Sequence, residues 1–273
     1  MPSLSFESDG GKPVAYITVS KEELKEKPEM KELNNQIIYL HDDNSGVKNI
    51  EFKDLNIFPL LKFKEGERQN NRIAILAKSG AGKSYFVGQL LDMLKSKKFG
   101  DPERDICIIS GVEEDESLDR PRGPKGAKTP PERVDLYSAE FAELTPDDFQ
   151  DCVVCLDDIE NLTNKVANKQ VLNLRNAMLE RGRHNNIDVI SISHNALGGN
   201  LTRFVHSEST ACVVFPRYSQ VHQLSTYLKK YIGLNNDAIQ KIVEIGENKS
   251  RWVYISNLAP TYVIYQRGIY LVK

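Results

Sequence analysis

Cysteine is scarce in this sequence of 273 residues, which contains four. So few cysteines exclude a fold held together by a framework of disulfides. Cys152 and Cys155 have the spacing of a C-x-x-C pair, but they flank two valines within an apolar, strand-like run. Side chains three residues apart on a strand point to opposite faces, so these cysteines are expected to pack in a core rather than share a metal. The pattern favours a reducing compartment.

Long apolar runs and a large excess of charge are also missing. No run approaches the ~20 apolar residues of a membrane helix. The first residues, Met1 to Ser5, lack the basic and apolar regions of a secretory signal. We therefore expect a protein without a transmembrane segment, which acts where it is made or is carried elsewhere by a partner. A formal net charge of −2 argues against a protein that coats nucleic acid with its whole surface, although a local basic patch is compatible with it.

From residue 70 onward the sequence alternates apolar strands with helices. Short apolar runs predict buried strands, and helical spacing predicts the segments between them. The predicted strands cover 73–76, 106–109, 152–156, 189–193 and 211–215, and the predicted helices cover 83–94 and 169–181. This alternation predicts an α/β fold with a central, mostly parallel sheet flanked by helices. Ligands are then expected at the carboxyl ends of the strands.

The chain is expected to divide near residue 66. Residues 1–66 combine short β-like runs with a charged helical stretch broken by Pro28, which predicts a small β-containing cap or docking element. Residues 67–273 form the second predicted domain, with a core at about 70–217. Its remainder, 218–273, is predicted to contain helices near 218–231 and 236–245 and strands near 251–256, 262–266 and 269–272.

The strongest chemical signal is a glycine-rich turn between the first of these strands and the helix after it. The turn is Ala77-Lys78-Ser79-Gly80-Ala81-Gly82-Lys83-Ser84, followed by Tyr85. It matches the phosphate-loop pattern G-x-x-x-x-G-K-[ST] except that Ala77 replaces the first glycine. Glycines let backbone N–H groups wrap around phosphate oxygens, and the positive end of the helix dipole faces the same place. We expect Mg-ATP here, with Lys83 on the β- and γ-phosphates and Ser84 on Mg²⁺.

A second signal is the acidic pair after the strand at 152–156. One carboxylate there can hold Mg²⁺, and another can polarise the attacking water. We assign the first role to Asp157 and the second to Asp158, with Glu160 as the alternative base. His194, at the end of the next predicted strand, is a candidate sensor of the γ-phosphate, although it could equally cap the strand.

Three of these segments resemble the FtsK–HerA superfamily of DNA-pumping ATPases, and within it the genome-packaging ATPases of large DNA viruses, the poxvirus-like type. The matching segments are Lys78-Ser79-Gly80-Ala81-Gly82-Lys83-Ser84, with its early lysine, Asp157-Asp158-Ile159, and the run from Arg181-Gly182-Arg183-His184-Asn185-Asn186-Ile187 to His194. The likeness covers about residues 70–217. The chain departs from the family at Ala77, at His194, where glutamine is commoner, and at Asp158, where glutamate often serves as base.

The resemblance implies a RecA-like (ASCE) P-loop NTPase core that uses ATP and Mg²⁺. It further implies a homo-oligomeric ring, pentameric or hexameric, around double-stranded DNA. Capsid or membrane-associated portal components are implied partners, at a virion assembly site in the host cytoplasm or in the virion itself. A neighbouring subunit would supply an arginine to the site. The candidates for this role are Arg181, Arg183, Arg203 and Arg217.

The same resemblance gives a meaning to residues 120–133, which are rich in proline and have no periodicity, so that a loop is predicted. Its cations would contact DNA phosphates without reading bases; the alternative is a disordered surface loop. These cations are Arg120, Arg122, Lys125, Lys128 and Arg133.

Two other functions stay open. A small-molecule kinase also pairs a phosphate loop with acidic residues, although the loop at 120–133 is oddly placed for a lid. A docking or assembly protein that binds ATP without hydrolysing it is compatible with Ala77 and Asp158. A GTPase is disfavoured because no Asn-Lys-x-Asp segment is present: Asn164-Lys165 leads into Val166-Ala167.

Overall fold

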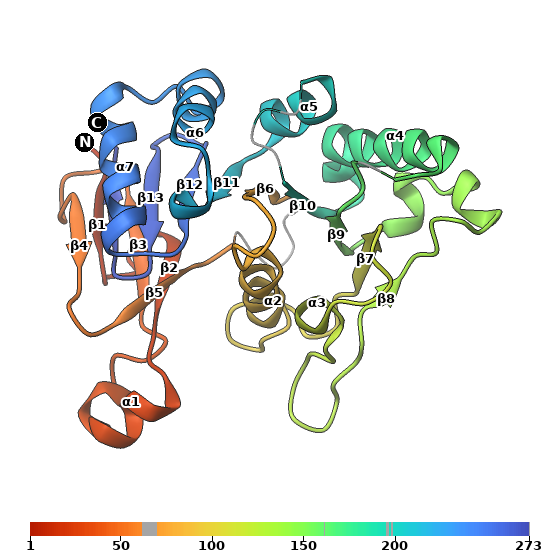
Figure 1. Cartoon of the computed structure of the whole chain (residues 1–273). Helices are drawn as coiled ribbons and strands as arrows, with labels where there is room; N and C mark the ends of the chain where they lie inside the picture. Colours follow the sequence, from red (N-terminus) through yellow and green to blue (C-terminus); the bar gives the residue numbers. More distant parts are fainter. Residues whose placement is uncertain (62–69, 161, 195–196, 198, 273) are drawn as a thin grey trace. The chain divides into compact units, whose positions relative to one another are not determined.

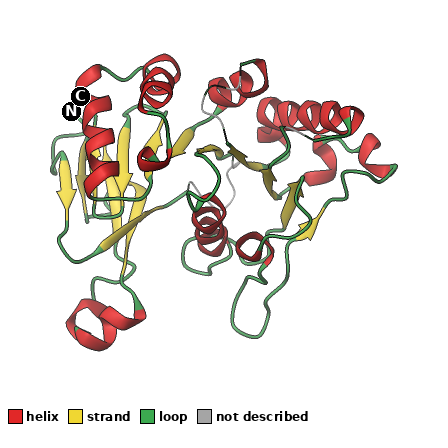
Figure 2. Ribbon diagram, in the orientation of Figure 1, coloured by secondary structure: helices red, strands yellow, loops and turns green. Residues whose placement is uncertain are grey.

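A computed structural model describes residues 1–61, 70–160, 162–194, 197 and 199–272. The chain divides into two compact units, drawn in Figures 1 and 2. One unit joins Met1–Lys62 to Val213–Lys273, and the other is Phe63–Cys212. The predicted domain of residues 67–273 therefore spans parts of both units. No helix in the described part of the chain is long and apolar enough to cross a membrane.

The unit of residues 63–212 is built on a parallel sheet with the strand order β6-β10-β9-β7-β8. Each neighbouring pair is parallel. The strands are β6 (Arg72–Leu76), β7 (Ile106–Ser110), β8 (Glu132–Arg133), β9 (Val153–Asp157) and β10 (Asp188–Ser193). The predicted strands of this unit and the mostly parallel sheet are thereby confirmed. The short β8 was not predicted from the sequence.

Burial explains why these segments are strands. Every residue of β9 and β10 is buried, as the continuous apolar runs require for a sheet covered on both faces. The register places Ser193 of β10 beside Leu76 of β6, and Ile192 beside Asp157 of β9. Because the strands are parallel, these carboxyl ends meet at one edge of the sheet. That edge is where a ligand is expected in an open α/β sheet.

Helices connect the strands of this unit. Asn164 caps α4, because its side chain accepts hydrogen bonds from the N–H groups of Val166 and Ala167. The helix α2 begins directly after Gly82. The helices are α2 (Lys83–Leu94), α3 (Glu116–Asp119), α4 (Lys165–Arg181) and α5 (Asn200–Glu208), with 3₁₀ turns η2 (Glu140–Glu143), η3 (Pro146–Phe149) and η4 (Gly182–His184).

A buried ion pair fixes the opposite edge of the sheet, where β9 and β10 begin. Nη1 of Arg104 lies 2.7 Å from Oδ2 of Asp188, and both side chains are almost fully buried. The guanidinium also donates to the backbone carbonyls of Asp151 and Cys152, while Asp188 accepts from the N–H of Asn71. With its polar atoms satisfied in this way, the pair holds the two strand starts together.

The other unit holds two antiparallel arrangements of strands. The first is the sheet β1-β3-β2-β5, and in the second β4 pairs with β14 in the order β4-β14-β13-β12. The strands are β1 (Ser3–Ser5), β2 (Lys12–Thr18), β3 (Ile37–His41), β4 (Asn49–Glu51), β5 (Asn56–Pro59), β12 (Val253–Ser256), β13 (Tyr262–Tyr265) and β14 (Gly268–Leu271). The strand β11 (Ala211–Val214) includes the boundary in the sequence between the two units, at Cys212 and Val213.

Contacts across the sequence hold this unit together. The rings of Phe58 and Trp252 meet edge to face, with centroids 5.6 Å apart. Lys249 pairs with Glu51 at 2.5 Å. The charged N-terminal stretch is a capped helix that stops before Pro28, as predicted. The helices of this unit are α1 (Lys21–Glu26), η1 (Pro28–Lys31), η5 (Pro216–Tyr218), α6 (Val221–Tyr227), the π-helix η6 (Leu228–Ile232) and α7 (Asn236–Asn248).

Candidate nucleotide-binding site

The predicted phosphate loop connects β6 to α2 at the carboxyl edge of the parallel sheet. Gly80 and Gly82 have φ angles of 75° and 94°, a left-handed conformation that residues with a side chain rarely adopt. Ala77 is not among the positive-φ residues, and its N–H donates to the carbonyl of Ser193 at 3.2 Å. Alanine is therefore compatible with the first position of the loop. Lys78, Ser79 and Gly80 are exposed, Ala81 is buried, Ser84 is half-buried and Tyr85 is 63% exposed.

The side chain of Lys83 folds back onto this loop. Its Nζ donates to the carbonyls of Ala77 and Lys78, at 2.9 and 3.1 Å, and to Nδ1 of His194 at 3.2 Å. Burial lowers the pKa of Lys83, and the charges of Asp157 and Asp158 oppose that shift. A buried ammonium at the start of a helix gives the loop the positive field that an anion requires.

Two carboxylates from the end of β9 lie beside this ammonium. Asp157 is buried, and its pKa is raised to about 6 by burial and by the negative charges of Asp158 and Asp115. Lys83 and His194 act in the opposite direction. Asp158 has a φ of 51° and a side chain that is 40% exposed. The left-handed turn therefore gives the two neighbouring aspartates different surroundings, one dry and one open to water.

His194 joins the lysine to the second aspartate. Its Nε2 lies 2.5 Å from Oδ1 of Asp158, while Nδ1 faces the Lys83 ammonium. An ammonium can only donate, so Nδ1 must accept, and Nε2 then carries the proton that it donates to Asp158. The two partners thus select one neutral tautomer of the ring. The predicted sensor lies within the predicted site, whereas its neighbour Asn195 falls outside the described residues.

Glu160, the alternative base, is engaged elsewhere. It accepts a hydrogen bond from Oγ of Ser193 at 2.8 Å, and Nη1 of Arg175 lies 3.8 Å from its other oxygen. Arg175 is 1% exposed, and it also donates to the carbonyl of Leu201 in α5 at 2.6 Å. Burial raises the pKa of Glu160. Arg175 was not predicted from the sequence, because its position on α4 gives no sign of a carboxylate partner on a separate element.

The candidate trans arginines differ in what they contact. Arg217 donates to the carbonyl of Glu247 near the end of α7, so its guanidinium is already used within its own unit. Arg181 lines a small groove between α4 and the turns η2 and η3. Arg183 and Arg203 are exposed and make no hydrogen bond or ion pair with other described residues. These last two are free to reach a neighbouring molecule.

The basic loop differs from the expectation of five available cations. Arg122 is 2% exposed and pairs with Asp92, which corrects its prediction as a DNA contact. Arg120 pairs with the same aspartate, and Arg133 pairs with Asp119. Only the two lysines of the set, Lys125 and Lys128, are exposed without a hydrogen bond or ion pair to another described residue.

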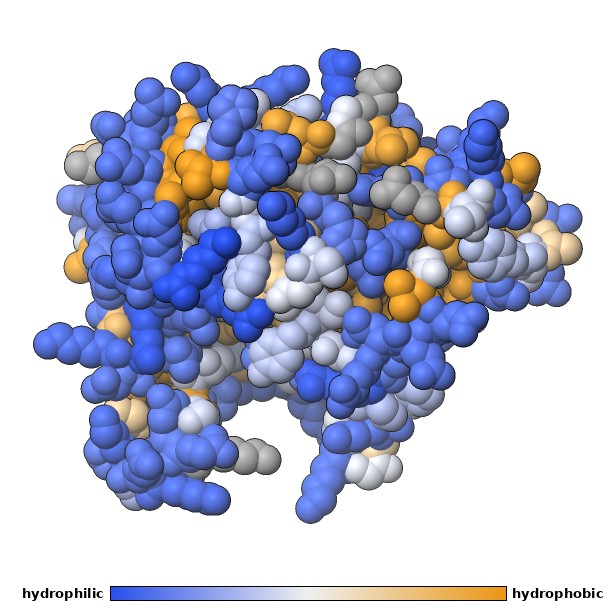
Figure 3. Space-filling model, in the orientation of Figure 1, coloured by the Kyte–Doolittle hydropathy of each residue, from blue (hydrophilic) through white to orange (hydrophobic). Residues whose placement is uncertain are grey.

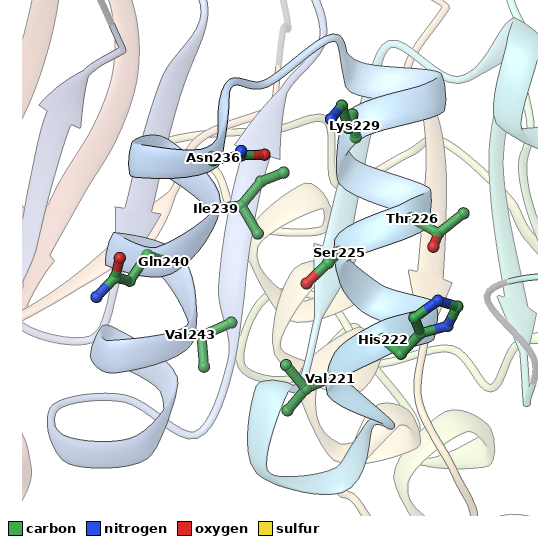
Figure 4. A pocket seen from close by; sticks show the side chains of 9 residues that line it. All are labelled: Val221, His222, Ser225, Thr226, Lys229, Asn236, Ile239, Gln240 and Val243. Atoms are coloured by element: carbon green, nitrogen blue, oxygen red, sulfur yellow. The ribbon is translucent and has the colours of Figure 1, made fainter.

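A second concave feature belongs to the other unit, between α6 and α7. Figure 4 shows its lining, and its volume is about 460 Å³. Val221 comes from one helix and Ile239 and Val243 from the other, with Lys229 toward one end. His222 and Lys229 are the titratable side chains that line it. None of the residues that were predicted from the sequence to bind ATP or Mg²⁺ lines this groove.

The strand order and the loop define the class of this protein. In the sheet, β10 lies between the strand before the phosphate loop and the strand with the acidic pair. With Lys83 at the start of α2, this is the RecA-like (ASCE) core of a P-loop NTPase.

No protein-family model matches the chain. It belongs to the same family as protein V3 of Sputnik virophage, itself described as uncharacterized. The two are 31% identical over 198 residues, which cover 72% of this chain and 75% of V3.

Solved structures show a weaker likeness. The genome-packaging NTPase B204 of Sulfolobus turreted icosahedral virus 2, in complex with AMPPCP, is 12% identical, and the match covers 74% of this chain and 97% of B204 at a TM-score of 0.43. The conjugation coupling protein TcpA of pCW3, with ATPγS, is 13% identical over 97% of this chain and 88% of TcpA, at a TM-score of 0.49. Similarity of this degree carries no argument of its own about function.

Proposed function

We propose that this protein hydrolyses ATP and uses the energy to translocate double-stranded DNA. The observation that supports ATP hydrolysis is a series of side-chain contacts. It runs from Lys83 through His194 to Asp158, and Asp157 lies beside it. A cation for phosphate, a carboxylate open to water and a ring that contacts both are the groups that phosphoryl transfer to water requires.

The residues of the loop fit a nucleotide with its metal ion. The helix α2 is twelve residues long, so its positive end is well developed, and Ser84 lies in its first turn. No group of three or more His, Cys, Asp or Glu side chains within the described ranges could hold a metal alone. Mg²⁺ is commonly held by one or two protein ligands together with phosphate oxygens and water. Ser84 and Asp157 suit that arrangement, and the bound ion would neutralise charge on the phosphates.

The other residues of the site then take separate roles. Asp158 polarises the attacking water, because its carboxylate is accessible and is oriented by Nε2–H of His194. A γ-phosphate drawn to Lys83 competes for the ammonium that now donates to His194, so the ring senses whether the phosphate is present. Glu160 orients the end of β10 through Ser193 and is not the base. Arg183 or Arg203, both exposed, acts in the site of a neighbouring subunit.

The resemblance of the motifs to genome-packaging ATPases supports DNA as the polymer, and membership of a family with a virophage protein supports a viral setting. We propose a ring of five or six subunits that packages a viral genome at a virion assembly site, with capsid or portal components as partners. The nucleotide site described above does not depend on this part of the proposal.

The test is ATP hydrolysis by the purified protein, measured with and without linear duplex DNA. Turnover that rises with DNA, and is lost in Lys83→Ala, is the expected result. Tight binding of Mg-ATP without turnover, in concentrated and DNA-loaded samples alike, would overturn hydrolysis and leave an ATP-binding assembly protein. Turnover that responds to a small-molecule acceptor instead of DNA would identify a kinase.

A further inference from the structure

The basic loop is a folded hairpin. We call residues 122–129 the basic hairpin. Its neck is closed by two reciprocal hydrogen bonds: the N–H of Arg122 donates to the carbonyl of Thr129, and the N–H of Thr129 donates to that of Arg122, both at 2.9 Å. Gly123 and Gly126 turn the chain with φ angles of 126° and 92°. Figure 1 shows the hairpin extending between α3 and β8, away from the strands of its unit.

The neck is fixed by the buried side chain of Arg122. Its guanidinium donates to the carbonyls of Ser117, Leu118 and Arg120. Its Nε also lies 3.1 Å from Oδ1 of Asp92 in α2. Burial lowers the pKa of this arginine, and the charge of Asp92 opposes that shift. A buried cation is tolerated only with partners of this kind, so the geometry of the neck is strongly specified.

A second arginine, Arg120, links the segment before the hairpin to α2. Arg120 pairs with the other carboxylate oxygen of Asp92 and approaches the carbonyl of Gly88 at 3.4 Å. A Cβ on Gly88 would lie 2.8 Å from the carbonyl of Ser117, so a glycine is needed where α3 comes this close to α2. The segment that leads into the hairpin is therefore packed directly against α2.

The helix α2 leads from there to the nucleotide site. It begins at Lys83, and Asp92 follows nine residues later, about 13 Å along the axis at 1.5 Å per residue. Most of its residues between these two points are buried against the sheet. The helix α2 thus connects the phosphate loop to the ion pairs at the neck of the hairpin.

The far end of the hairpin carries two lysines. Lys125 and Lys128 are exposed, and neither makes a hydrogen bond or ion pair with another described residue. Figure 3 shows blue, hydrophilic atoms beside paler ones at the lower end of the view, where Figure 1 draws this hairpin. Unpaired ammonium groups on flexible stems suit the phosphates of a nucleic-acid backbone, because they need no fixed direction of approach.

We propose that the basic hairpin binds the phosphate backbone of duplex DNA, and that Asp92, through Arg120 and Arg122, couples this contact to the phosphate loop. The proposal rests on the proposed function, since it gives the place where the ATPase touches its DNA. It assigns contact to Lys125 and Lys128 alone, and it makes Asp92 a positioning residue with no DNA contact.

The first measurement is the affinity for a short duplex at several salt concentrations, by fluorescence anisotropy with a non-hydrolysable ATP analogue. The double variant Lys125→Ala/Lys128→Ala should reduce the slope of log affinity against log salt by about 1.8, because each phosphate contact contributes about 0.9. Lys25→Ala/Lys31→Ala removes the same charge from exposed positions in α1 and η1 and should keep the slope of the wild type.

The second measurement is DNA-stimulated hydrolysis by Asp92→Asn. This variant should keep the DNA-free turnover and the salt slope of the wild type, while the stimulation by DNA falls at least fivefold. Asp42→Asn neutralises an exposed carboxylate in the other unit and should keep the full stimulation. Thermal unfolding of each variant would show that the protein tested is folded.

The two proposals fail in different ways. Wild-type protein that neither binds duplex DNA nor responds to it overturns the proposed function. If the wild type does respond, an unchanged slope in Lys125→Ala/Lys128→Ala overturns the hairpin as a DNA contact. Full stimulation in Asp92→Asn overturns the coupling.

Discussion

The ammonium of Lys83 lies 3.2 Å from Nδ1 of His194, so the lysine of the phosphate loop is already bonded to the residue expected to sense the γ-phosphate. The same ring donates from Nε2 to Asp158 at 2.5 Å. A phosphate that attracts the ammonium therefore changes the hydrogen bonding of the ring that orients the second aspartate. In the proposed mechanism, this side chain links the binding of the phosphate to the activation of the water.

His194→Ala should lower kcat at least tenfold while the dissociation constant for ATP stays within about twofold, because orientation of the water is lost and the phosphate loop is intact. His194→Gln should retain most of kcat, since an amide can both accept from Lys83 and donate to Asp158. Steady-state hydrolysis and binding of a fluorescent ATP analogue would measure both quantities. His222→Ala, which changes an exposed histidine of α6, is the control. A weaker affinity with unchanged kcat would contradict the assignment.

The elements that the sequence predicted are those with a local signal. The apolar run of β9 predicts a buried strand, and the glycines at 80 and 82 allow the positive φ angles of the turn. The strand and the phosphate loop could therefore be placed without tertiary information. The predicted strand, 152–156, is shifted by one residue from β9, which begins at Val153 and ends at Asp157.

The features that were not predicted depend on partners far along the chain. Arg122 lies among prolines and lysines, which is typical of a solvent-exposed loop, yet it is buried because Asp92, thirty positions earlier, faces it from α2. Glu160 was predicted as the alternative base, but Arg175 and Ser193 engage it. Long-range ion pairs of this kind leave no periodicity in the sequence.

The stability of the nucleotide-free protein should depend on Asp157 in a pH-dependent way. Its pKa is about 6 in the folded protein and 3.8 ordinarily, so the folded state binds more protons than the unfolded state between these values. The free energy of unfolding therefore falls as the pH rises through this range. Asp157→Asn removes the effect: its advantage over the wild type should be near zero at pH 4 and reach about 2–3 kcal/mol above pH 7. Urea unfolding in EDTA would measure this difference.

For the same experiment, Asp42→Asn is the matched control, because its carboxylate is exposed. A difference between Asp157→Asn and the wild type that is constant from pH 4 to pH 8 would contradict the burial of an unpaired carboxylate at the end of β9.

We expect Asp158 to be a catalytic carboxylate and Glu160 to be a structural one. Asp158→Asn should lower single-turnover hydrolysis by about 100-fold or more, the scale of a lost general base, with little change in stability because the side chain is half-exposed. Glu160→Gln should keep hydrolysis within about threefold but lower the free energy of unfolding by about 1–3 kcal/mol, since the buried Arg175 loses its counter-charge. The reverse pattern would make Glu160 the base.

The exposed arginines should act between subunits if the ring exists. Lys83→Ala abolishes the nucleotide site of a subunit but leaves its arginines intact, whereas a variant lacking the trans arginine keeps its own site and cannot complete its neighbour's. A mixture of the two inactive proteins therefore contains interfaces in which an intact site faces an intact arginine. We expect Arg183→Ala or Arg203→Ala, whichever removes the trans arginine, to be inactive alone. Mixing that variant with Lys83→Ala should restore DNA-stimulated hydrolysis at up to about a quarter of the wild-type rate for random assembly.

Arg217→Ala, whose side chain binds the carbonyl of Glu247 in its own unit, is the control and should need no such partner for activity. If Arg183→Ala and Arg203→Ala are each as active alone as the wild type, neither residue acts in trans, and the neighbour's cation would have to come from another element.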